Sequence, residues 1–100
     1  MALPPFLSAL AEYDPTFAQE IEKIVSLSFQ DSSLDPKTRT LIALALDTVL
    51  GASEGVASLA NQARSLGVSE QEIADTLRLA YFTAGNSVLT TSFAAFNKKE

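Results

Sequence analysis

The sequence contains no cysteine and no histidine. Without cysteine the chain has no disulfide, no thiolate nucleophile and no thiol redox cycle, and without histidine it lacks the usual imidazole base and metal ligand. Any chemistry must therefore use carboxylates, hydroxyl groups, lysine or arginine. Neither a metal site nor a cofactor is predicted.

Basic residues and uninterrupted apolar runs are also scarce. Seven Lys and Arg stand against twelve Asp and Glu, which gives a net charge of −5, so a nucleic-acid partner is not predicted. The uncharged stretch 79–97 approaches the length of a membrane span, but polar and glycine residues interrupt it, and no membrane association is expected. Residues 1–7 lack the charged region and the long apolar run of a secretory signal, so a cytoplasmic location is the expectation.

What is present is helical periodicity. Apolar residues recur at helical spacing with stop signals between the runs, which predicts an all-α fold of four to five helices. One hundred residues are enough for one modest core, and we expect a single domain, 1–100. The helices are expected over 5–12, from 15 to about 29, over 36–50, from 53 to about 66, and over 70–96 with a kink or break at 85–87.

Local sequence signals set the ends of these helices. Asp14-Pro15 and Asp35-Pro36 each place a capping residue before a proline at the first helical position, and Ser53 is expected to cap the fourth helix. Gly51 and Gly67 are suited to the left-handed conformation that ends a helix, and Ser69-Glu70-Gln71-Glu72 has the pattern of a capping box.

Two of the helices, 36–50 and 70–96, are apolar over more than the stripe that one small core can cover. In the last helix the residues expected to face inward are Ile73, Leu77, Ala80, Tyr81, Ala84, Val88 and Leu89. Because contiguous exposed apolar patches normally mark interfaces, the sequence predicts a homo-oligomer. The alternative is ordinary packing within one chain.

Two segments carry a family resemblance. Leu34-Asp-Pro-Lys-Thr-Arg-Thr-Leu-Ile-Ala-Leu-Ala-Leu46 and Ala63-Arg-Ser-Leu-Gly-Val-Ser-Glu-Gln-Glu-Ile-Ala-Asp-Thr-Leu77 resemble the signature region of the carboxymuconolactone decarboxylase/AhpD family, which spans 34–80 here. The resemblance implies an AhpD-like helical bundle that assembles as a trimer or hexamer. It also implies where the family's reactive residues would stand: its Glu at Thr40, its Cys-x-x-Cys at Ala52 and Gly55, and its His at Leu59.

None of these four positions carries the carboxylate, thiol or imidazole that the family has there, so the resemblance implies a protein without thiol peroxidase chemistry. The first hypothesis is a non-catalytic or altered-function binding module that retains the scaffold. A second is a Cys-independent lyase or isomerase acting on a small carboxylated lactone, with Arg39 as anchor and Asp47 or Glu54 as the acid/base. A third is a helical protein–protein adaptor.

Each candidate residue also has a structural interpretation. Asp47 lies seven residues after Thr40, hence on nearly the same helix face, and would then be paired with an arginine (Arg39, Arg64 or Arg78) or reach solvent at a helix end. Glu54 stands in a first helical turn, where the helix dipole favours an anion. Arg39 would then form an intersubunit ion pair.

Overall fold

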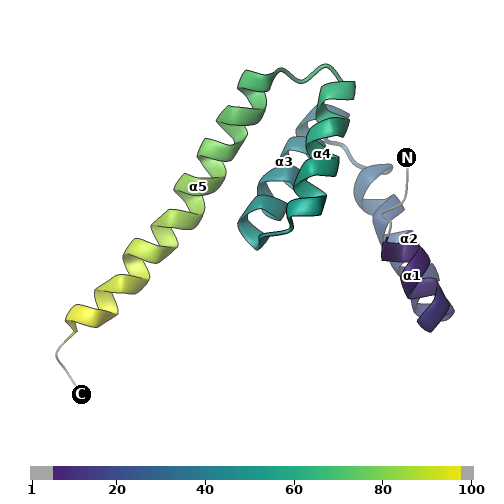
Figure 1. Cartoon of the computed structure of the whole chain (residues 1–100), viewed down its shortest axis with the longest axis horizontal. Helices are drawn as coiled ribbons and strands as arrows, with labels where there is room; N and C mark the ends of the chain where they lie inside the picture. Colours follow the sequence, from purple (N-terminus) through teal and green to yellow (C-terminus); the bar gives the residue numbers. More distant parts are fainter. Residues whose placement is uncertain (1–5, 98–100) are drawn as a thin grey trace. The chain divides into compact units, whose positions relative to one another are not determined.

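Helices and their connections make up the structure, a computed structural model that describes residues 6–97 (Figure 1). No strand occurs among these residues, and the predicted all-α fold is confirmed. Contacts divide the chain into two compact units, 1–35 and 36–100. That residues 1–100 form one domain stays a prediction.

The first unit is a pair of helices, α1 (Phe6–Tyr13) and α2 (Pro15–Phe29). Asp14 is the N-cap of α2, as predicted, and its Oδ1 accepts the backbone N–H of Phe17 at 3.1 Å. Pro5, the expected start of α1, lies outside the described residues. Leu7 from α1 and Ala18 from α2 are the buried residues among those described in this unit.

The second unit begins with a hairpin of two helices, α3 (Pro36–Leu50) and α4 (Ser53–Ser65). Gly51 has φ = 77°, the left-handed conformation that ends α3 as predicted. The prediction that Ser53 caps α4 was wrong. Ser53 is already helical, and the N-cap is Ala52, whose N–H donates to the carbonyl oxygen of Asp47 at 2.9 Å and so closes the end of α3.

A Schellman motif and a capping box connect α4 to α5 (Glu70–Ser92). Val68 donates to the carbonyl of Ala63, and Gly67, with φ = 88°, donates to that of Arg64, both at 3.0 Å. In the capping box, Ser69 N–H donates to Glu72 Oε1 at 2.8 Å, and Glu72 N–H donates to the Ser69 hydroxyl at 3.0 Å.

Helix α5 runs without the break expected at 85–87 and passes into a short 3₁₀ segment, η1 (Phe93–Phe96). The prediction was wrong because one glycine inside a long helix costs only about 1 kcal/mol, which the flanking turns can absorb. None of the described helices is long and apolar enough to cross a membrane.

The core of the second unit lies where α3, α4 and the first half of α5 meet. Its fully or nearly buried members are Leu44, Ala63, Val68 and Ile73, with Leu41, Val56, Leu59, Ala60 and Leu77 packed around them. Ala80 is also buried, but beyond it α5 leaves this core. Tyr81, Val88 and Leu89, expected to face inward, are 81%, 69% and 62% exposed, so that part of the prediction was wrong.

Candidate functional site at the α3–α4 hairpin

The hairpin places the predicted site residues on two adjacent helices. Thr40, Leu44 and Asp47 share one face of α3, and the first two are buried. From α4, Gly55 and Leu59 are half-buried, whereas Ala52 is exposed in the turn before the helix. Arg39 is half-buried on α3, next to Thr40 along the chain but turned by about 100° around the helix.

Leu59 is an ordinary core residue. It packs against the cluster that contains Leu44, the one side chain with no exposed surface among the large buried residues described. At a position where the resemblance implies an imidazole, the structure therefore has hydrocarbon in contact with hydrocarbon. Such a side chain contributes to packing and has no group that could move a proton.

Asp47 lies directly against Gly55. A Cβ placed on Gly55 would stand 3.1 Å from Asp47 Cγ and closer still to Asp47 Oδ2, too close for any side chain to be added without movement of the carboxylate. The Asp47 carboxylate therefore occupies the space that a side chain at position 55 would need. Sequence reasoning singled out both residues but not their contact. The available signal was that each lies four residues from the turn glycine, Gly51.

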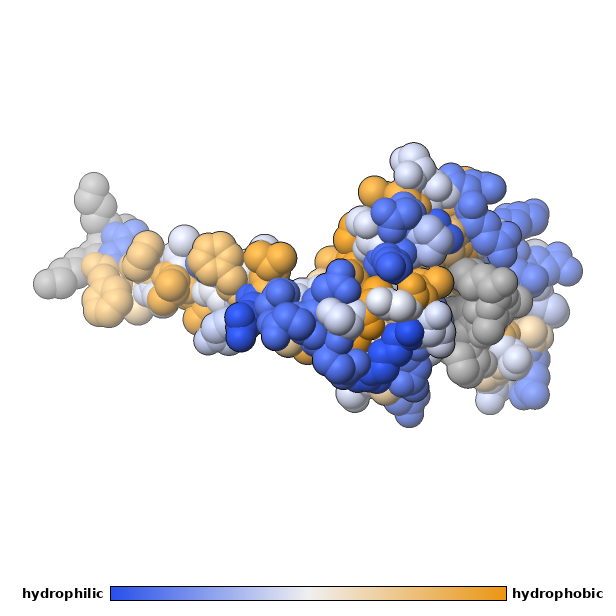
Figure 2. All heavy atoms as spheres, turned by 90° about the horizontal axis from the view of Figure 1, so that it is seen from above, coloured by the Kyte–Doolittle hydropathy of each residue, from blue (hydrophilic) through white to orange (hydrophobic). Residues whose placement is uncertain are grey.

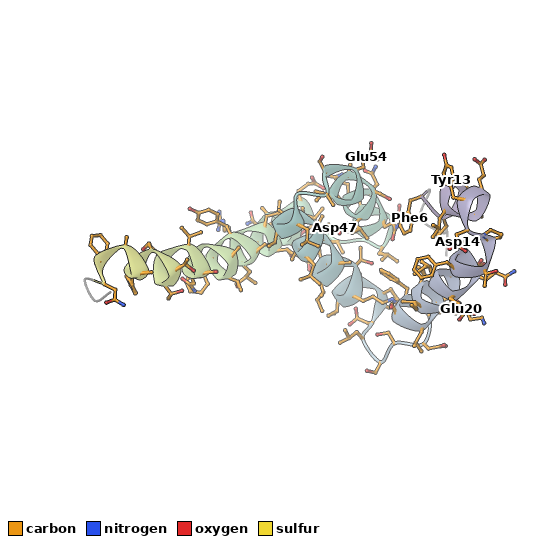
Figure 3. All side chains as sticks on the ribbon, turned by 90° about the horizontal axis from the view of Figure 1, so that it is seen from below. Phe6, Tyr13, Asp14, Glu20, Asp47 and Glu54 are labelled. Atoms are coloured by element: carbon orange, nitrogen blue, oxygen red, sulfur yellow. The ribbon has the colours of Figure 1, made fainter. Side chains whose placement is uncertain are left out.

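The Asp47 carboxylate is half-buried and lies beside the first turn of α4. No side chain caps this helix, since its N-cap is Ala52. An anion is favoured there because the first backbone N–H groups of a helix point toward it. Figure 3 shows Asp47 on α3 and Glu54 at the outer edge of α4. Glu54 is exposed.

Two of the three arginines proposed as partners of Asp47, Arg64 and Arg78, are engaged elsewhere. Arg64 binds Glu70 through two hydrogen bonds, Nε to Oε2 at 2.7 Å and Nη2 to Oε1 at 3.0 Å, and Arg78 Nη1 lies 3.6 Å from Asp75 Oδ1. Both arginine side chains face solvent. Within residues 6–97, Asp47 has no side-chain ion pair, so the predicted pairing with Arg64 or Arg78 was wrong.

Electrostatic shifts are found at the start of α5. The hydrogen bonds from Arg64 hold the pKa of Glu70 below its usual value and raise the pKa of Arg64. The backbone N–H of Ser69 lowers the pKa of Glu72, assisted by the Ser69 hydroxyl. These groups are exposed, and their hydrogen bonds stabilise the connection between α4 and α5. Among the described residues no group of three acidic side chains is placed to hold a metal ion.

The sequence profile of the carboxymuconolactone decarboxylase family matches residues 15–98. The chain belongs to this family. No curated protein and no solved structure matches the chain. The matched residues run from α2 to η1 and include the whole α3–α4 hairpin.

Proposed function

We propose that this member of the carboxymuconolactone decarboxylase family is an oligomeric binding module without thiol peroxidase chemistry. The observation that carries the proposal is the contact between Asp47 and Gly55. The end of the Asp47 side chain lies where a Cβ at position 55 would stand, so a side chain there would require the carboxylate to move aside. Leu59 supports the same conclusion, because a residue in the core cluster is poorly placed to exchange protons with a ligand.

A peroxide reduction assay tests the proposal. The full chain, purified and supplied with hydrogen peroxide and a dithiol reductant, is expected to show no turnover above the reductant alone. The chain has no thiol of its own, so a positive signal cannot come from a stray cysteine. Turnover that scales with protein concentration and survives repurification would overturn the proposal.

A Cys-independent lyase or isomerase is the second candidate, favoured by one observation: Asp47 is a half-buried carboxylate without an ion-pair partner among residues 6–97. A carboxylate in that setting can take up and return a proton next to a carbonyl group. Small carboxylated lactones are the substrates to test, in an assay that follows loss of the lactone in the presence of the purified chain. If a rate is found, Asp47→Asn should abolish it, and Glu54→Gln, which changes an exposed acid of the same hairpin, is the matched control.

A further inference from the structure

The second half of α5 and the 3₁₀ segment η1 that continues it carry a regular seam of exposed residues, called the seam of α5 below. Positions 79, 82, 86, 89, 93 and 96 follow one another at intervals of three and four, the spacing that keeps side chains on one line where two helices pack together. The seam residues are Leu79, Phe82, Asn86, Leu89, Phe93 and Phe96. The five apolar members are between 62% and 78% exposed. Figure 2 shows apolar side chains gathered over this end of α5, at the left of the view.

The seam carries no charge. Residues 79–97 include no Asp, Glu, Lys or Arg, although the chain as a whole has a net charge of −5. Two copies of an acidic chain repel one another over most of their surfaces, because like charges brought together in an interface destabilise it. A charge-free seam is the part of such a chain that can meet a copy of itself without that penalty.

The exposed area is sufficient for a stable contact. The five apolar residues of the seam present roughly 700 Å² per copy, approaching the ~800 Å² per partner of a standard interface. The intervals of the seam also read the same in both directions. In an antiparallel pair Leu79 would therefore face Phe96, Phe82 would face Phe93, and Asn86 would face Leu89 of the other copy.

We propose that the seam of α5 binds the same seam of a second copy of this chain, with the two helices antiparallel. The proposal rests on the oligomeric part of the proposed function and names the surface that forms the contact. An antiparallel arrangement keeps the acidic first turns of the two α5 helices, with Glu70 and Glu72, at opposite ends. Such a contact is isologous, because each copy contributes the same residues. Asn86 is the polar member of the seam, and placing its amide against Leu89 of the other copy lowers the affinity of the pair.

Sedimentation velocity of the full chain over a range of concentrations tests the proposal. The unmodified chain is expected to dimerise, and Leu89→Glu is expected to weaken the dimer at least 100-fold, because it places two carboxylates in the seam. Thr91→Glu is the matched control, since it adds the same charge two residues away on the opposite side of the helix, and it should leave the dimer essentially unchanged. Far-UV circular dichroism of each variant checks that α5 remains helical.

Three results would overturn the proposal, and they differ in what they say about the proposed function. A stable oligomer that Leu89→Glu leaves intact would refute the seam but not oligomerisation. A monomer whose seam residues react with labelling reagents added to the solvent would refute both the seam contact and oligomerisation. A monomer whose seam is protected would show that residues of the same chain cover it.

Introduced cysteines test the orientation, because the chain has none of its own. Phe82→Cys mixed with Phe93→Cys is expected to give a cross-linked heterodimer under mild oxidation, and each variant alone should cross-link poorly. Cross-linking of Phe82→Cys with itself, to the exclusion of the mixed pair, would refute the antiparallel arrangement.

Discussion

The two halves of the last helical segment, α5 with η1, differ in burial and in charge. Residues 70–80 bury Ile73 and Ala80 against the rest of their unit and expose charged side chains such as Glu70 and Arg78. Residues 81–96 bury no side chain and carry no charge. Figure 1 shows α3 and α4 alongside the first half of α5, with the second half extending beyond them.

This difference in burial shows that regularly spaced apolar residues can have two causes: packing within the unit, or contact with a partner outside its core. In the first half, hydrophobic residues have partners within the described part of the unit, and the outward face is solubilised by charge. In the second half, hydrophobic residues are spaced with equal regularity but lack such partners. A helix that is apolar and solvent-exposed over four turns is unfavourable as an end state, so its partner must come from outside the α3–α4 core.

The largest expected effect is the difference between the losses of stability caused by Leu44→Ala and by Leu89→Ala. Leu44 has no exposed surface, and its truncation should lower the free energy of unfolding by about 3 kcal/mol, through lost burial and the cavity left behind. Leu89 is 62% exposed, and at concentrations where the chain is monomeric its truncation should change stability by no more than about 0.5 kcal/mol.

Urea denaturation followed by circular dichroism, repeated at two protein concentrations, measures both values. The Leu89→Ala effect should grow with protein concentration, since it would then report dimer dissociation, whereas that of Leu44→Ala should be similar at both. Equal losses for the two variants in dilute solution would mean that both halves of α5 are packed within one chain.

The contact between Asp47 and Gly55 predicts that the effect of Gly55→Ala on stability depends on whether the Asp47 carboxylate is present. Replacing a helical glycine by alanine ordinarily stabilises a helix by about 1 kcal/mol. In the unmodified chain Gly55→Ala should forfeit this gain, because the new methyl group displaces the Asp47 carboxylate. In an Asp47→Ala background the same change should recover it.

A double-mutant cycle measured by urea denaturation gives the coupling directly, and we expect about 1 kcal/mol between the two sites. Gly85→Ala is a useful comparison, because a Cβ there would meet only the Tyr81 ring at ordinary contact distance. Additive effects at 47 and 55 would show that the carboxylate moves aside without loss, and the site would then be less tightly packed than the contact indicates.

Sequence reasoning succeeded where structure is decided within a few residues. The Asp14 cap, the left-handed glycines at 51 and 67 and the reciprocal bonds of Ser69 and Glu72 all depend on neighbours along the chain, and all were predicted. The exposure of Leu89 was not, because periodicity shows which residues share a face but not what covers that face. The contact of Asp47 with Gly55 was also missed, since it depends on how closely α3 and α4 approach.

The smallest expected effect concerns the acidic start of α5. In the folded chain the Ser69 backbone N–H lowers the pKa of Glu72, so this carboxylate is a stronger acid there than in the unfolded chain. Its contribution to stability is therefore complete above the unfolded pKa, near 4.3, and is lost as the pH falls through the lower folded value.

Glu72→Gln keeps a hydrogen-bonding group in the capping box but removes the charge. The variant should be slightly less stable than the unmodified chain at pH 7, and the difference should shrink as the pH falls below the folded pKa of Glu72, as measured by thermal unfolding over an acid series. A difference in stability that does not change with pH would show that the interaction of Glu72 with Ser69 does not depend on ionisation.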